Sequence, residues 1–126
     1  MSVIGVGVDL VEVARIERAL ERFGERFLKR IFTQGELDYC QSMPHPARHL
    51  AARFAAKEAA SKAFGTGIGR SMGWKDIDIG RRKTGEPYLV FGGQAKNLAA
   101  ERRVTNQLVT LSHTDKHATA VVVLEL

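Results

Sequence analysis

The sequence has 126 residues, 44% of them hydrophobic and 26% charged, and this size and composition predict one globular domain spanning residues 1–126. No run approaches the roughly 20 apolar residues of a membrane-spanning helix. The first residues also lack the basic start and the long apolar segment of a signal peptide. We therefore expect a cytoplasmic protein without a membrane segment. The formal net charge of +5 favours a polyanionic partner, such as nucleic acid, a nucleotide cofactor or an acidic protein. The single cysteine excludes an intrachain disulfide, and no paired His/Cys spacing predicts a zinc site.

The first predicted element is a strand at residues 3–8, because Val and Ile dominate this run and two glycines interrupt it. Asp9 follows at the expected end of the strand, and helical periodicity then runs from Glu12 to Phe27. Asp9 therefore has two interpretations. It is either the N-cap of this helix, a position that aspartate favours, or a ligand for a metal ion.

The predicted helix at residues 12–27 carries a cationic stripe at helical spacing. Its members are Arg15, Arg18, Arg22 and Arg26. Glu21 and Glu25 follow two of these arginines by three residues and could neutralise them, which would make the stripe an ordinary solvated face. The alternative is a docking surface for an acidic protein helix, because complementary charge steers encounter and sets register.

Local signals delimit the next two helices. Thr33 and Glu36 have the spacing of a capping box, which opens a short helix. A longer helix is predicted over residues 46–64, since proline suits its first turn and Gly65 suits its end.

The longer helix is rich in alanine, yet it carries charged residues in a stretch that should be largely buried. Glu58 and Lys62 lie one turn apart and could simply pair with each other, and a surface lysine is usually a solvated charge. The other interpretation is that Glu58 meets Asp9 in space. Mg²⁺ prefers oxygen ligands and usually takes one or two protein carboxylates, so these two acids would suit that ion.

Strands are predicted mainly in the second half of the chain, after a glycine-punctuated loop at residues 65–73. The expected elements are strands at 76–79 and 88–91, a helix at 94–103, and strands at 107–112 and 118–126 that form an antiparallel pair. Helices cluster first and strands later, which favours an α+β fold, with a mainly antiparallel sheet packed against the long alanine-rich helix.

Two long motifs carry a resemblance to a known family. Residues 5–16 (GVGVDLVEVARI) resemble the opening motif of bacterial holo-acyl-carrier-protein synthases, and residues 53–67 (RFAAKEAASKAFGTG) are similar to the second motif of that family. Residues 32–37 and 112–114 also match. The resemblance therefore spans nearly the whole chain.

The resemblance implies an α+β subunit of the phosphopantetheinyl transferase superfamily. Such enzymes move the 4′-phosphopantetheine arm of coenzyme A to a serine of apo acyl carrier protein, with Mg²⁺ as cofactor, and serve fatty acid biosynthesis. By this resemblance Asp9 and Glu58 bind the metal. For a family member of this length, the resemblance also implies a homotrimer with the active sites between subunits.

Further roles follow from the same resemblance and from the chemistry of phosphate transfer. Lys62 would neutralise a phosphate oxygen as the leaving group departs. The serine proton has three possible fates: transfer to Glu58, transfer to a metal-bound water, or transfer to neither. The helix after the first motif is the family's carrier-protein docking element, which assigns the arginine stripe to docking. We expect coenzyme A to contact Arg53, Ser61, Lys62, Gly65, Thr66, Gly67 and His113, although an exposed histidine at a hairpin turn is often incidental.

The expected transferase binds no nucleic acid, and two other functions are alternatives to it. A small basic nucleic-acid-binding protein would explain the net charge and the arginine stripe, but aromatic residues make up only 7% of the chain and form no stacking platform. A phosphate-ester hydrolase with the same metal pair would differ only in transferring the group to water.

Overall fold

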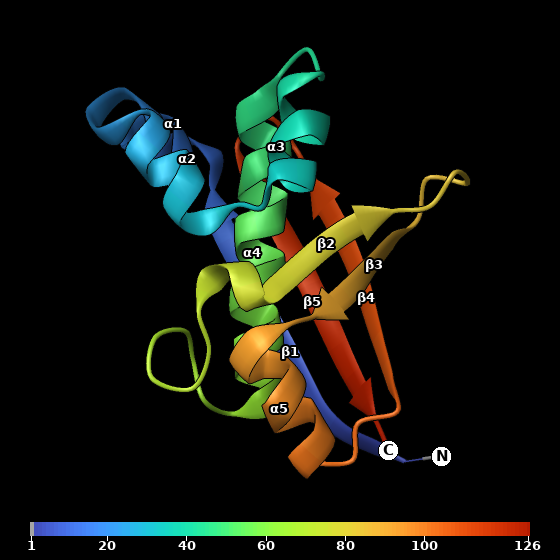
Figure 1. Cartoon of the computed structure of the whole chain (residues 1–126). Coiled ribbons are helices and arrows are strands. Elements are labelled where there is room, and N and C mark those ends of the chain that lie inside the picture. The colour runs from blue at the N-terminus through green and yellow to red at the C-terminus, as the bar shows by residue number, and fades with distance from the viewer. Residues whose placement is uncertain (1) are drawn as a thin grey trace.

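The computed structural model describes residues 2–126. One strand begins the chain, four α-helices follow, and the other four strands lie in the second half (Figure 1). The helices are α1 (Val13–Phe23), α2 (Glu25–Ile31), α3 (Gln34–Gln41), α4 (Pro46–Phe64), the short 3-10 helix η1 (Trp74–Asp76) and α5 (Gly93–Glu101). The strands are β1 (Val3–Glu12), β2 (Ile77–Arg81), β3 (Pro87–Phe91), β4 (Asn106–His113) and β5 (His117–Glu125). None of the helices in residues 2–126 is long and apolar enough to cross a membrane.

The strands form two antiparallel sheets on either side of α4. Strand β5 lies in the middle of the three-stranded sheet, between β1 and β4, and β2 pairs with β3 in the second sheet. In Figure 1, α4 runs across the larger sheet, while β2 crosses the other side of the helix. This arrangement confirms the predicted α+β fold with an antiparallel sheet against the long helix.

Helix α4 is the centre of the molecule, and 13 of its 19 residues are buried. Because it is covered on most sides, it needs small or apolar side chains all round rather than one apolar stripe. Alanines supply this, and Leu50 and Phe64 add bulk where neighbouring elements leave room. Both charged side chains that α4 buries, Arg53 and Lys57, therefore need a specific explanation.

The local signals of the middle of the chain are confirmed. The Thr33 hydroxyl accepts a hydrogen bond from the Glu36 amide at 3.3 Å, and the Glu36 carboxylate accepts one from the Thr33 amide at 2.8 Å, which is the predicted capping box. Helix α4 has the predicted bounds. Gly65 ends it with φ of 79°, a left-handed conformation that glycine adopts without steric cost.

Two expectations about the first 27 residues are wrong. Strand β1 does not end before Asp9 but continues to Glu12, because β5 offers it hydrogen-bonding partners throughout; Asp9 lies opposite Ala120. Glu12, not Asp9, is the N-cap of α1. The predicted helix is also interrupted at Gly24, where φ is 57°, so Arg26 lies on α2 instead of α1.

Candidate active site

Asp9 faces α4 because side chains alternate along β1. Gly5, Gly7, Asp9 and Val11 point towards the helix, and the residues between them point outwards. A Cβ atom at Gly7 would lie 1.8 Å from the Ala59 carbonyl oxygen, which only glycine avoids. The strand therefore lies directly against the helix backbone, and a short aspartate side chain reaches the helix surface.

Glu58 is the half-buried carboxylate on the part of α4 that Asp9 approaches. Burial, and after it the negative charge of Asp9, raise the pKa of Glu58, while the Lys62 and Arg15 charges oppose this rise. The electrostatic effect of Asp9 on Glu58 means that the two acids, 49 positions apart in the sequence, are close neighbours in the fold.

Lys62 is the third member of this group, but it does not pair with Glu58, as the spacing of these two residues along the helix suggested. Its ammonium nitrogen lies 2.9 Å from an Asp9 carboxylate oxygen and also donates to the Val8 carbonyl at 3.3 Å. Lys62 thus pairs with Asp9 on the strand rather than with Glu58 one turn away. The hydrogen bond to Asp9 raises the pKa of Lys62, so this side chain is a firm positive charge in the site.

The ligand chemistry of this group fits a hard divalent cation. Two carboxylates from separate elements supply oxygen ligands, and no group of three or more His, Cys, Asp or Glu side chains suited to a metal occurs within residues 2–126. Mg²⁺ commonly has few protein ligands and completes its octahedron with water and substrate phosphates. A cation between Asp9 and Glu58 would also relieve the repulsion that raises the Glu58 pKa.

A second group of side chains surrounds Arg53, which is 1% exposed. Its guanidinium stacks on the Tyr39 ring at 4.5 Å and donates to the His49 carbonyl at 3.2 Å. Its Nε and Nη2 groups are buried without a hydrogen-bond partner. Arg81 stacks on the same tyrosine ring at 5.0 Å. This cluster has unused donor capacity for an anion.

His113 adjoins this cluster from the end of β4. Its ring meets the His49 ring edge-on, with 4.9 Å between centroids, and it remains exposed to solvent. Burial, followed by the charge of His113, lowers the pKa of His49 to about 4, so His49 is neutral at physiological pH. Sequence analysis found Arg53 and His113. It missed Tyr39 and Arg81, which no local pattern connects to Arg53, and it missed His49, although His49 lies one turn before Arg53 on α4.

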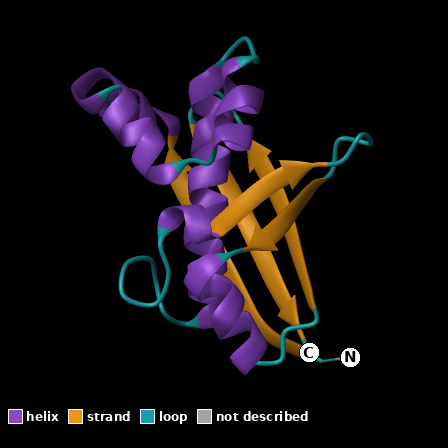
Figure 2. Cartoon of the chain, in the orientation of Figure 1, coloured by secondary structure: helices purple, strands orange, loops and turns teal. Residues whose placement is uncertain are grey.

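The glycine loop after α4 leaves the helix beside Ser61 (teal in Figure 2). The Ser61 side chain is buried and donates to the Glu58 carbonyl at 2.7 Å, and the amides of Thr66 and Gly67 bond to the Ser61 carbonyl. Gly65 and Thr66 are exposed. Ser61 therefore stabilises the helix end, while the loop offers its backbone to a ligand.

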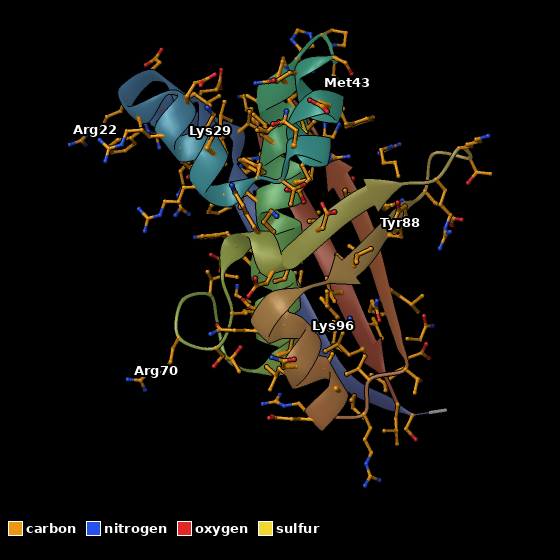
Figure 3. All side chains as sticks on the ribbon, viewed as in Figure 1. Arg22, Lys29, Met43, Arg70, Tyr88 and Lys96 are labelled. Atoms are coloured by element: carbon orange, nitrogen blue, oxygen red, sulfur yellow. The ribbon has the colours of Figure 1, made fainter. Side chains whose placement is uncertain are left out.

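The four arginines of the stripe are all exposed, three on α1 and Arg26 on α2. Figure 3 shows Arg22 projecting away from the body of the molecule. Glu25 pairs with Lys29, and neither Glu21 nor Glu25 forms an ion pair with an arginine among the described residues. Beside the stripe lies a groove of about 470 Å³ whose walls are arginines and apolar side chains. Its lining residues are Arg15, Ile16, Ala19, Phe23, Arg26, Phe27, Arg30, Ile31, Phe54 and Trp74.

A strand and a central helix that bring two carboxylates and a lysine together supply groups suited to an enzyme acting on a phosphate-bearing substrate. The chain belongs to the 4′-phosphopantetheinyl transferase superfamily, whose sequence pattern matches residues 5–122. Holo-[acyl-carrier-protein] synthase from Koribacter versatilis is 46% identical over 98% of both chains. The enzyme of the same name from Carboxydothermus hydrogenoformans is 49% identical over 94% of both.

Solved structures agree with this assignment. The chain is similar to the holo-[acyl-carrier-protein] synthase of Neisseria meningitidis, with a TM-score of 0.91 and 34% identity over 99% of this chain and 100% of that one. It is also similar to the Helicobacter pylori enzyme solved in complex with coenzyme A, with a TM-score of 0.85 and 32% identity over 95% and 99% of the two chains.

Proposed function

We propose that this protein is a holo-acyl-carrier-protein synthase, which transfers 4′-phosphopantetheine from coenzyme A to a serine of apo acyl carrier protein. The observation that carries the proposal is the meeting of Asp9, Glu58 and Lys62 in a chain that resembles such synthases over its whole length. Fatty acid biosynthesis is the process served, and the cytoplasm is the proposed location. Cys40 is a free thiol, which is compatible with a reducing compartment. Burial raises its pKa to about 11 and keeps it unreactive.

The reaction joins the serine oxygen of the carrier protein to the phosphorus that bears the pantetheine arm. The bond from this phosphorus to the bridging oxygen of the pyrophosphate breaks, and that oxygen leaves on adenosine 3′,5′-bisphosphate. Glu58, whose pKa burial raises, is the candidate within the chain to accept the serine proton. The bisphosphate leaves with additional negative charge, which Lys62 is placed to neutralise.

Asp9 and Glu58 would hold Mg²⁺ on the coenzyme A pyrophosphate, where the ion supplies Lewis-acid stabilisation and a template for the phosphates. Lys62 holds Asp9 in the described structure, so this lysine fixes the carboxylate and keeps a positive charge beside it. Both effects depend on positioning and electrostatics, which supply most of the catalysis in phosphate transfer.

The rest of the coenzyme A would extend from this centre to the cluster around Arg53. The exposed backbone of Gly65 and Thr66 and the half-buried backbone of Gly67 would permit close approach, and Ser61 holds the start of that loop. Arg53 and His113 would receive a phosphate at the far end, where two guanidinium donors lack partners. The exposed arginines Arg15, Arg18, Arg22 and Arg26 would bind the acidic carrier protein.

Mass spectrometry of apo carrier protein tests the proposed function directly. After incubation with the protein, coenzyme A and Mg²⁺, we expect a mass gain equal to one phosphopantetheine, and no gain when the carrier serine is replaced by alanine. Release of adenosine 3′,5′-bisphosphate without a mass gain would instead indicate a hydrolase. Absence of both products would contradict the proposal.

Lys62→Ala is expected to lower the turnover number more than it raises the KM for coenzyme A. The lysine contacts Asp9 at the reacting end of the site, so its charge acts mainly as the leaving group departs. Steady-state kinetics measure both constants, and Lys96→Ala, an exposed lysine on α5 (Figure 3), is the matched control. A pure rise in KM would make Lys62 a binding residue only.

We propose a homotrimer, supported by an apolar face on the larger sheet. Val6, Val8 and Leu10 point away from α4 and are 56–67% exposed, and Leu108 on β4 is 50% exposed. The strand register puts Val123 of β5 between Val6 and Leu108. Such a continuous apolar surface is typical of a subunit interface, and identical subunits arranged head to tail close into a ring.

Val8→Lys is expected to dissociate the assembly, because it places a charge at the centre of this face. Analytical ultracentrifugation should show a mass near that of one chain for Val8→Lys and about three times that mass for the wild type. Ala100→Lys, on the exposed side of α5, should leave the mass unchanged. A wild-type protein that sediments as one chain would contradict the trimer.

A further inference from the structure

Lys57 and Glu36 form an ion pair in the interior of the protein. Their charged atoms lie 2.9 Å apart, and both side chains are 0% exposed. Removing two charges from water costs so much that apolar residues of similar size often stabilise a fold equally well or better. Stability therefore does not explain why these two positions are charged. In the described structure neither side chain bonds to Asp9, Glu58 or Lys62.

The hydrogen bonds of this pair join four separate elements. The Lys57 ammonium donates to Glu36, to the Trp74 carbonyl at 3.1 Å and to the Ile77 carbonyl at 2.6 Å, so all three of its donors are used. The Glu36 carboxylate also accepts bonds from the amides of Thr33 and Ile79, both at 2.8 Å. The pair thus ties α4 to the first turn of α3, to η1 and to β2.

One of these connections leads to the active site, and another leads to the groove beside the arginine stripe. Lys57 immediately precedes Glu58, and successive residues of a helix point about 100° apart, so a Lys57 side chain fixed in the interior sets the direction of Glu58. The Trp74 backbone held by Lys57 carries the ring that stacks on Phe54, with 4.9 Å between centroids. The Arg15 guanidinium lies over the Phe54 ring of this stack, 5.3 Å from the ring centroid.

We propose that Glu36 and Lys57 are positioning residues that fix the rotation of α4, so that Glu58 faces Asp9, and that hold the Trp74–Phe54 stack under Arg15. The effect on catalysis rests on the proposed function, whereas the effect on Trp74 does not. Neither residue touches substrate or metal. Both act through Glu58 and Trp74.

The double variant Glu36→Met with Lys57→Met separates positioning from stability. Methionine has a similar length and no charge, so the double variant should melt near the wild-type temperature, while each single variant leaves a buried, unpaired charge and melts lower. Trp74 is the sole tryptophan of the chain, and its fluorescence reports on the stack directly. We expect acrylamide to quench it more strongly in the double variant than in the wild type.

Turnover of the double variant should fall about a hundredfold, the scale of a misplacement of about 1 Å in an active site, while the KM for coenzyme A changes little. The same replacement at the exposed pair Glu25 and Lys29 should change neither quenching nor turnover. A stable double variant with wild-type quenching and turnover would overturn the proposal. If the wild type itself transfers nothing, the proposed function fails, and the quenching result still decides the role in positioning.

Glu36→Gln provides a second variant in case the double variant does not fold. Glutamine keeps the side-chain volume and one acceptor oxygen but removes the charge that balances Lys57. We expect Glu36→Gln to increase the quenching of Trp74 and to lower turnover, both by less than the double variant does. A folded Glu36→Gln protein that matches the wild type in both would contradict the proposal as decisively.

Discussion

Glu58→Gln is expected to abolish phosphopantetheine transfer and, at the same time, to stabilise the metal-free fold. Burial and the adjacent Asp9 raise the pKa of Glu58, so the folded state disfavours its ionised form. That penalty is present above the raised pKa and disappears as the pH falls below it. The gain in melting temperature should therefore be seen at neutral pH and vanish in acid.

Asp9→Ala and Glu58→Ala should each reduce transfer by more than about a hundredfold, since loss of a mere outer partner of a metal ligand already costs ten- to a hundredfold. Glu101→Gln, an exposed carboxylate on α5, is the control and should behave as the wild type. Mass spectrometry of the carrier protein measures transfer, and thermal unfolding without metal measures stability. Retention of most of the Mg²⁺-dependent rate by either alanine variant would place the metal elsewhere.

Reversing the charge of Arg15 or Arg22 is expected to weaken carrier-protein binding severely and to leave coenzyme A binding nearly normal. Both side chains are exposed on α1, and no acidic residue of the chain pairs with them in the described structure. An acidic partner would be attracted over a distance that salt limits to about 8 Å at physiological ionic strength. Higher salt should therefore weaken the wild-type complex as well.

Calorimetric titration of Arg15→Glu and Arg22→Glu with carrier protein and with coenzyme A tests this expectation. Arg82→Glu changes the same charge on the β2–β3 hairpin, outside the stripe, and serves as the control. Unchanged carrier affinity in both stripe variants would eliminate the docking role. Loss of nucleic-acid binding in these variants, with no carrier binding by the wild type, would favour the nucleic-acid-binding alternative.

Sequence analysis predicted most of the elements whose signals are local. The capping box at Thr33 and Glu36, the bounds of α4 and the β4–β5 hairpin each depend on residues close together in the chain, and all are present. The end of β1 was wrong because its last residues pair with β5, more than a hundred positions away. The break at Gly24 was missed because the helical periodicity continues across it.

The candidate site shows the same division. The meeting of Asp9 and Glu58 was one interpretation of their residues, and the family resemblance then favoured it. The fold brings the two acids near each other. The pairing of Lys62 with Asp9 instead of Glu58 depends on how closely β1 approaches α4. Tyr39 and the buried pair of Lys57 with Glu36 join elements that meet only in three dimensions, so no spacing rule could find them. His49 lies one turn before Arg53 on α4, a helical spacing that could have indicated it.

The pairing of β1 with β5 has a consequence for synthesis of the protein. The Thr119 hydroxyl bonds to the backbone carbonyl of Asp9 across 110 positions, and Figure 1 shows the two ends of the chain side by side. A ribosome that adds 5–20 residues per second has already made α4 several seconds before β5 exists. Until β5 emerges, β1 has no strand to pair with, and the nascent chain cannot form the sheet that carries Asp9. Enzyme activity therefore begins only after translation has passed the last strand.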